Sequence, residues 1–107
     1  MAVVHEWDAA AFAEAVKSGV VIADFYAVWC GPCRMMMSVL EKAAAEFSDD
    51  QLKAGKINIE KYRDLAARYD IRTIPTFIVF KDGEVKSVSI GVKSQKMLVE
   101  AIRQELD

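Results

Sequence analysis

Hydrophobic stretches recur along the chain with a spacing that predicts five strands. The almost wholly apolar run at 20–27 is typical of a strand that is covered on both faces of a sheet. Residues 76–80 form a second clear strand, and Asp82-Gly83 predicts a tight turn into a partner strand. Two further stretches with weaker patterns complete the set. The predicted strands span 3–5, 20–27, 52–59, 76–80 and 85–90.

Apolar residues at helical spacing predict four helices between these strands. Asp8 and Ser94 are suitable N-caps for the first and last helix, and Gly19 follows the end of the first. The helices are predicted at 9–17, 33–47, 62–69 and from Ser94 to about 106. The apolar positions expected on their inner faces are Ala10, Phe12, Ala13 and Val16, then Met36, Met37, Leu40, Ala43, Ala44 and Phe47, and finally Met97, Leu98, Ala101, Ile102 and Leu106. This element order predicts an α/β protein whose mixed sheet carries helices on both faces.

Composition and charge narrow the class of protein. The 107 residues, 53% hydrophobic and 28% charged, predict one globular domain over 1–107. The net charge of −2 provides no basic field for nucleic acid or anionic lipid. The first residues do not resemble a signal peptide, and no apolar run approaches the roughly 18 residues of a membrane span. We therefore expect a cytoplasmic protein that binds neither nucleic acid nor membranes.

The segment Trp29-Cys30-Gly31-Pro32-Cys33 contains both cysteines and lies where a strand leads into a helix. Two thiols at this spacing predict thiol–disulfide exchange. Cys30, at the helix N-terminus, is the expected nucleophile, because free backbone N–H groups and the helix dipole favour a thiolate there. Cys33, one turn further on, can form a disulfide with Cys30 and would resolve the mixed disulfide with a substrate.

Each residue of this segment also has a less specific interpretation. The thiols could form half of a zinc site, although zinc needs about four ligands and His5 is the only other soft candidate. A purely structural disulfide would gain little, because the loop is short. Gly31 would let a partner chain approach, and Pro32 suits a first helical turn, but both are also common turn residues. Trp29 is either an exposed contact surface or a partly buried cap on the helix end.

Asp24 and Pro75 stand out within apolar surroundings. Asp24 is a single charge inside the 20–27 strand, where burial raises the pKa of a carboxyl and lets it exchange a proton near neutral pH. The alternative is a structural ion pair. Pro75 precedes a strongly apolar strand, which a proline tolerates only at the strand's start or edge. Met35, Met36 and Met37 are expected to be packing residues of the helix.

The Trp-Cys-Gly-Pro-Cys segment, the order of elements and Ile74-Pro75-Thr76 resemble the thioredoxin family over essentially the whole chain. The resemblance implies the thioredoxin fold, a central mixed five-stranded sheet flanked by four helices. It also implies a monomeric protein-disulfide reductase that acts on protein disulfides and is itself reduced by an NADPH-dependent flavoprotein, thioredoxin reductase. The chain has no dinucleotide-binding glycine motif, so we expect it to bind no cofactor and no metal.

The resemblance also implies roles for individual residues. Asp24 would lie behind Cys33 and help to deprotonate it, with Lys56 as its partner. The Ile74–Pro75 bond would be cis and face the dithiol, where the Ile74 backbone binds an extended substrate. Gly91 and Val92 would complete the apolar substrate surface.

Three positions depart from the common family pattern, and two other functions stay open. Ser38 replaces a frequent proline, Tyr26 a frequent tryptophan, and Val28 a more polar residue. The first rival is an isomerase or oxidase on the same fold. The second is a non-enzymatic protein that docks partners through Trp29 and Pro75.

Overall fold

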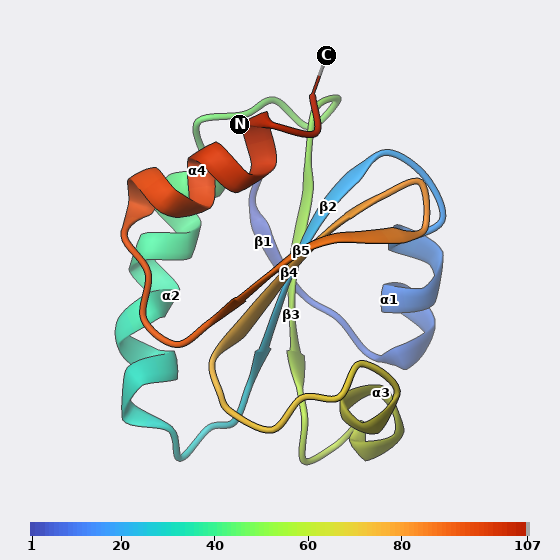
Figure 1. Ribbon diagram of the computed structural model, residues 1–107, viewed down its shortest axis with the longest axis vertical. Coiled ribbons are helices and arrows are strands. Elements are labelled where there is room, and N and C mark those ends of the chain that lie inside the picture. The colour runs from blue at the N-terminus through green and yellow to red at the C-terminus, as the bar shows by residue number, and fades with distance from the viewer. Residues whose placement is uncertain (107) are drawn as a thin grey trace.

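The computed structural model describes residues 1–106, which form a five-stranded sheet between two layers of helices (Figure 1). The strands lie in the order β1-β3-β2-β4-β5. This confirms the predicted five strands and four helices. The strands are β1 (Val4–Glu6), β2 (Val20–Tyr26), β3 (Lys53–Asn58), β4 (Thr76–Lys81) and β5 (Glu84–Ile90). The helices are α1 (Ala9–Ala15), α2 (Gly31–Ala44), α3 (Arg63–Arg68) and α4 (Gln95–Arg103).

The sheet is mixed, as the element order predicts. Strands β1, β3 and β2 are parallel, whereas β4 is antiparallel to β2 and β5 is antiparallel to β4. Helices α2 and α4 cover one face, and α1 and α3 cover the other (Figure 1). The parallel strands end at the lower edge in Figure 1, so the β2–α2 connection and α3 lie at the same end of the molecule.

Strand β2 runs through the middle of the sheet and contributes to both halves of the core. Ile22 packs with the side chains of α2 and α4, whereas Val21 and Phe25 pack on the opposite face. This follows from the two-residue period of a strand, because alternate side chains point to opposite faces. The apolar run is therefore a strand covered on both sides, as its composition predicts.

Local side-chain contacts explain where the elements begin and turn. Asp8 accepts a hydrogen bond from the Ala11 N–H at 2.8 Å, and Ser94 accepts one from the Met97 N–H at 3.1 Å, which confirms both predicted N-caps. The β4–β5 turn places Asp82 at φ 51° and Gly83 at φ 87°, the positive values that such a turn requires.

Several predicted inner positions are wrong. Met35 is 59% exposed and Met37 also reaches solvent, so only Met36 packs into the core. Successive helical residues are about 100° apart, and three consecutive methionines cannot all face the sheet. By the same geometry Met97 is exposed. Ala10 and Ala13 are exposed too, which leaves Phe12 as the buried residue of α1.

Both boundaries of α2 also differ from the prediction, and the other three helices end one to three residues earlier than predicted. Helix α2 begins at Gly31 rather than residue 33, because Cys30 is its N-cap and a proline is tolerated in a first turn. It ends at Ala44, with hydrogen-bonded turns continuing to Phe47. Within residues 1–106, no helix combines the length and apolar character needed to cross a lipid bilayer.

Candidate active site

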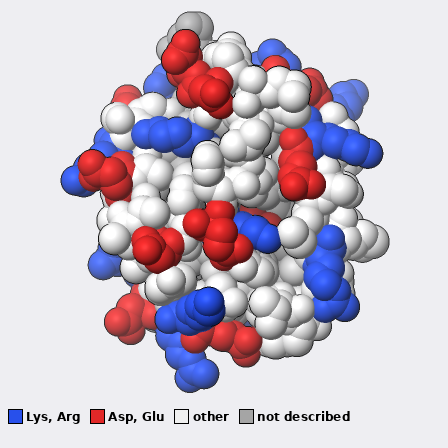
Figure 2. All heavy atoms as spheres, turned by 180° about the vertical axis from the view of Figure 1, so that it is seen from behind, with Lys and Arg blue, Asp and Glu red and all other residues white. Residues whose placement is uncertain are grey.

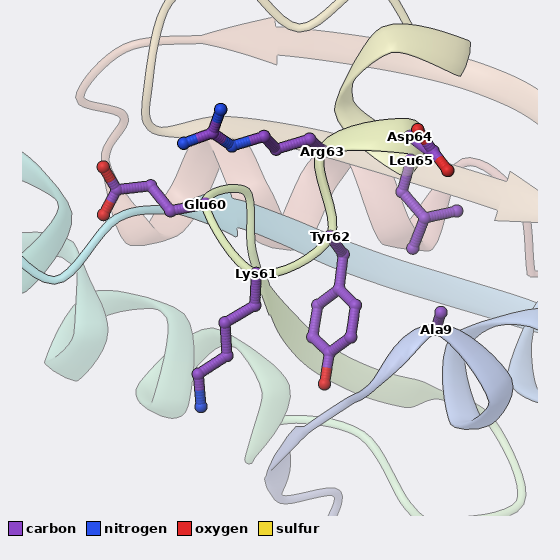
Figure 3. A pocket seen from close by; sticks show the side chains of 7 residues that line it. All are labelled: Ala9, Glu60, Lys61, Tyr62, Arg63, Asp64 and Leu65. Atoms are coloured by element: carbon purple, nitrogen blue, oxygen red, sulfur yellow. The ribbon is translucent and has the colours of Figure 1, made fainter.

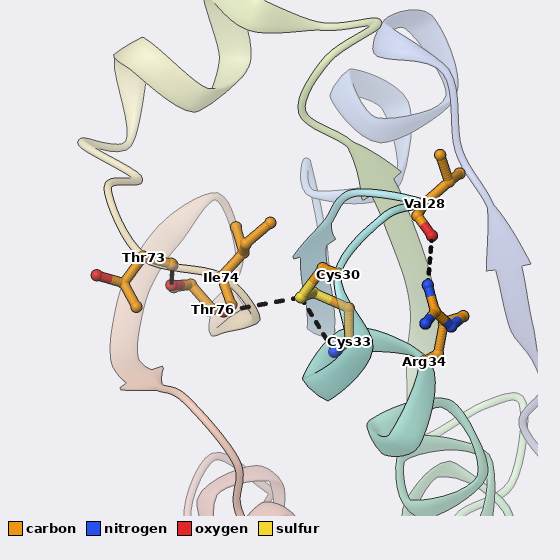
Figure 4. Close-up of a disulfide and its surroundings, with 7 residues drawn as sticks. All are labelled: Val28, Cys30, Cys33, Arg34, Thr73, Ile74 and Thr76. Atoms are coloured by element: carbon orange, nitrogen blue, oxygen red, sulfur yellow. Dashed lines mark hydrogen bonds between the residues drawn. A yellow bond between two sulfur atoms is a disulfide. The ribbon is translucent and has the colours of Figure 1, made fainter.

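The two cysteines lie at the junction of β2 and α2 and form a disulfide (Figure 4). Their Cα atoms are 5.2 Å apart. Cys30 is the N-cap of α2, and its Sγ accepts a hydrogen bond from the backbone N–H of Cys33 at 3.2 Å. A free N–H group of the first helical turn therefore points at the Cys30 sulfur, an arrangement that favours negative charge there.

Both sulfur-bearing residues lie in a small apolar environment. Cys30, Cys33 and Ala27 are buried together, and Tyr26, Ile59 and Ile74 pack against them. The loop before Cys30 is held by Arg34, whose Nη1 donates a hydrogen bond to the Val28 carbonyl at 2.9 Å (Figure 4). Sequence reasoning missed Arg34, because a side-chain contact with a backbone carbonyl has no signature in the sequence.

The Ile74–Pro75 segment faces the dithiol across this environment. The peptide bond is cis, as the resemblance implies. The Cys30 Sγ lies 4.0 Å from the Ile74 carbonyl oxygen (Figure 4). The Gly91 N–H donates to the Pro75 carbonyl at 2.8 Å, and the Thr76 hydroxyl donates to the Thr73 carbonyl at 2.5 Å. These bonds fix the segment beside the sulfurs, and neither threonine was predicted.

Apolar side chains in the segments that carry the predicted contact residues are exposed. Trp29 is 63% exposed, so it is not the partly buried cap that the sequence allowed. Val28 and Val92 are also exposed. Gly31 and Pro32 form the first turn of α2 between the two cysteines. Trp29, Gly31 and Pro32 thus adjoin Cys30 along the chain, and the Ile74 carbonyl lies beside its sulfur.

Asp24 is buried on the strand β2, between β3 and β4. Its exposure is 1%, and neither carboxylate oxygen has a hydrogen-bond partner among residues 1–106. Burial raises the pKa of the Asp24 carboxyl from 3.8 to about 7, with the nearby Lys56 lowering the pKa and Glu6 raising it. The carboxyl lines a cavity of about 100 Å³ together with Val4, Met37, Leu40, Glu41 and Lys56.

Lys56 is next to Asp24 in register, but its closest carboxylate partner is another residue. The two stand opposite each other on β3 and β2. The Lys56 Nζ lies 3.6 Å from the Glu6 carboxylate and 5.1 Å from the centre of the Tyr26 ring. Sequence reasoning named Lys56 as a partner for Asp24 and did not anticipate Glu6, because a charge on a short first strand gives no signal of its own.

A second cavity is lined by Cys33 and shares two lining residues with the first. It measures about 200 Å³ and is lined by residues that include Tyr26, Cys33, Met37 and Lys56. Met37 and Lys56 line both cavities, so the cavity at Asp24 and the cavity at Cys33 are neighbours.

A family model for thioredoxin matches residues 3–104. The chain belongs to the thioredoxin family. A thioredoxin from Bacillus subtilis is 42% identical, with 99% of this chain and 100% of the relative covered. A thioredoxin from Staphylococcus aureus is 39% identical over the same shares. The solved structure of a mutant thioredoxin from Halobacterium salinarum superposes with a TM-score of 0.87 at 31% identity, covering 99% of this chain and 92% of that chain.

Membership of this family and the Cys30–Cys33 disulfide make the chain a protein-disulfide oxidoreductase. The thioredoxin fold expected from the sequence is confirmed. Within residues 1–106, no three histidine, cysteine or acidic side chains are grouped in a way that could hold a metal ion.

One face of the molecule carries mixed charges. Figure 2 shows acidic and basic side chains interspersed over one face, which is hollowed near its middle where the two kinds adjoin. A further pocket of about 290 Å³ lies between α3 and the start of α1, and Figure 3 shows Tyr62 and Leu65 directed toward Ala9 there. Its charged residues are two acids and two bases, so no single ligand charge is favoured.

Proposed function

We propose that this member of the thioredoxin family is a cytoplasmic protein-disulfide reductase in which Cys30 is the nucleophile and Cys33 the resolving thiol. The hydrogen bond from the Cys33 N–H to the Cys30 sulfur at the start of α2 carries the assignment. It stabilises negative charge on Cys30 and leaves Cys33 inside the first turn of the helix. Cys30, which directly follows the exposed Trp29, is therefore the residue whose sulfur attacks a substrate.

The proposed reaction has two exchange steps. The Cys30 thiolate attacks one sulfur of a substrate disulfide, so that a Cys30–substrate disulfide forms and the other substrate sulfur leaves as a thiolate. The Cys33 thiol then loses its proton and attacks the Cys30 sulfur, which releases the second substrate thiolate. The substrate gains two electrons, and the Cys30–Cys33 disulfide is left on the protein.

Asp24 is the proposed acceptor of the Cys33 proton. Its cavity of about 100 Å³ has room for about three water molecules, and the neighbouring cavity reaches Cys33. A carboxyl with a pKa of about 7 can take up and return a proton near neutral pH. Lys56, which lines both cavities, is the proposed supporting charge.

The substrate is proposed to bind on the surface around Cys30 as an extended segment. The Ile74 backbone beside the sulfur would pair with it as a neighbouring strand does. The exposed Trp29 and Val92 would contact its side chains. The full proposed contact set is Trp29, Gly31, Pro32, Ile74, Pro75, Gly91 and Val92.

A reductant must restore the dithiol after each cycle. We propose an NADPH-dependent flavoprotein, thioredoxin reductase, because family membership implies one and the chain has no nucleotide-binding motif of its own. A protein that donates electrons in this way needs a reducing compartment, which supports the cytoplasm. We further propose that the chain acts as one domain and as a monomer.

Reduction of insulin disulfides by dithiothreitol tests the proposed order of the two cysteines. The wild type should accelerate insulin reduction, and Cys30→Ser should abolish the acceleration. Cys33→Ser should form a long-lived mixed disulfide with insulin that mass spectrometry detects. A mixed disulfide on Cys33 in the Cys30→Ser variant, with none on Cys30 in the Cys33→Ser variant, would reverse the assignment.

The role of Asp24 is tested by the pH dependence of the same reaction. Asp24→Asn should slow reduction and remove the change in rate near pH 7, since the buried proton acceptor is lost. Asp49→Asn, a neutralised aspartate on the exposed segment after α2, is the matched control and should keep the wild-type profile. An unchanged profile in Asp24→Asn would exclude Asp24 from the proton transfer.

A further inference from the structure

Three charged residues stand side by side across three neighbouring strands. Glu6 on β1 is in register with Lys56 on β3, and Lys56 is in register with Asp24 on β2. Residues opposite each other in a sheet point to the same face, so the charges form a row of acid, base and acid beneath α2. The middle cation has two carboxylates within reach, and its position decides which of them it stabilises.

The structure shows that Lys56 is held by Glu6. The Lys56 Nζ is 3.6 Å from Glu6 Oε1, and the Tyr26 hydroxyl donates a hydrogen bond to Glu6 Oε2 at 2.6 Å. The two oxygens of Glu6 therefore have separate partners, whereas those of Asp24 have no hydrogen-bond partner among residues 1–106. The Tyr26 ring also lies against the ammonium, at 5.1 Å from its centre.

We propose that Glu6 is a positioning residue of disulfide reduction, which holds the Lys56 ammonium away from Asp24 and so sets the pH range over which Asp24 accepts the Cys33 proton. The inference rests on the proton-transfer role proposed for Asp24. Tyr26 fixes the Glu6 carboxylate, and Glu6 in turn fixes Lys56. Glu6 adds its own negative charge near Asp24, which acts in the same direction as withdrawal of the cation.

None of the other described groups around Asp24 contacts the Lys56 ammonium with a carboxylate as Glu6 does. From β4 the neighbour in register is Phe77, which carries no charge. From α2, Met37 and Leu40 line the cavity, and Glu41 is the ionisable residue that lines it. From β2 itself, Tyr26 is engaged with Glu6. Lys56 is the cation that lines this cavity, so its distance from Asp24 is the variable that Glu6 controls.

The test is the titration of the Asp24 carboxyl, followed by the ¹³C chemical shift of the labelled side chain in the intact protein. Glu6→Gln keeps the shape of the side chain and removes its charge, so Lys56 is free to approach Asp24. The midpoint of the Asp24 titration should fall by about 1 pH unit. Glu100→Gln makes the same charge change on the exposed side of α4 and should leave the midpoint unchanged.

The same substitution in a variant without Lys56 shows whether Glu6 acts on Asp24 through Lys56 or directly through its own charge. Lys56→Met removes the ammonium and should raise the midpoint. When Glu6→Gln is added to Lys56→Met, the midpoint of the Asp24 titration should fall clearly less than when Glu6→Gln is added to the wild type, because no Lys56 ammonium remains to be released. An unchanged midpoint in Glu6→Gln, or an equal fall in both backgrounds, would overturn the proposal.

The pH profile of insulin reduction by Glu6→Gln distinguishes this inference from the function on which it rests. If the midpoint of the Asp24 titration and the pH profile of the rate both move to lower pH, the control of Lys56 by Glu6 and the role of Asp24 in proton transfer are both supported. If the midpoint of Asp24 moves but the rate profile does not, the control of Lys56 by Glu6 stands and the role of Asp24 in proton transfer fails.

Discussion

Replacing Asp24 with asparagine should stabilise the protein at neutral and alkaline pH but not in acid. Burial raises the pKa of Asp24 from 3.8 to about 7 in the folded protein. Well below pH 3.8 the carboxyl is protonated in both states and has no effect on the pH dependence of stability. Between pH 4 and 7 only the unfolded chain releases the proton, so the free energy of unfolding falls as the pH rises.

The size of this loss follows from the two pKa values. Each unit of pKa corresponds to about 1.4 kcal/mol, so the difference between 3.8 and about 7 corresponds to about 4 kcal/mol, complete above pH 7. The full value applies because the side chain is almost completely buried. The asparagine side chain carries no charge at any pH, and the Asp24→Asn variant should therefore escape the loss.

Urea unfolding of the oxidised protein, followed by far-ultraviolet circular dichroism at pH 4, 6 and 8, measures the effect. The difference in unfolding free energy between Asp24→Asn and the wild type should grow from pH 4 to pH 8 by about 4 kcal/mol. The exposed Asp49→Asn variant should show no such growth. A difference that is the same at pH 4 and pH 8 would refute the argument that burial disfavours the charged form.

Three further predictions concern the packing and the surface. Gly55→Ala should lower the free energy of unfolding, measured with urea, by about 1–3 kcal/mol, because a Cβ at this position would overlap the Trp7 ring. A variant as stable as the wild type would contradict that packing. In the same assay, Met36→Ala should lower the free energy of unfolding by about 2–5 kcal/mol, because Met36 is buried. Met35 is exposed, so Met35→Ala should lower it by less than about 0.5 kcal/mol. Similar losses in the two variants would refute the observed orientation of α2. Trp29→Ala should keep the stability but reduce kcat/KM for insulin about tenfold, the loss typical of an exposed aromatic anchor; unchanged kinetics would remove Trp29 from the substrate surface.

Local sequence patterns predicted the helices, strands and turns well where one or a few neighbouring residues determine the backbone conformation. The apolar run forms the central strand β2, Asp8 and Ser94 cap their helices, and Asp82-Gly83 makes the predicted turn. The predictions failed where the direction of a side chain depends on the exact phase of a helix. The exposed Met35, Met37 and Met97 show this, because apolar character alone does not tell which side of the helix a residue occupies.

The candidate site was predictable in its chemistry but not in its contacts. A dithiol at a helix start and a carboxylate inside an apolar strand were visible as anomalies in the sequence. The partner of Lys56 was not, since pairing between strands far apart in the sequence decides whether the ammonium meets Asp24 or Glu6. Arg34 and Thr76 donate to backbone carbonyls, and such contacts have no signature in the sequence.

By itself, the sequence determined the kind of chemistry and the order of the elements, because thiol spacing, caps, turns and apolar runs act between near neighbours in the chain. Only the tertiary structure decided that Glu6, Lys56 and Asp24 lie in one row and that the Ile74 carbonyl lies beside Cys30. Those contacts arise from strand register and loop placement. Both depend on how the whole sheet packs against α2, which no local pattern encodes.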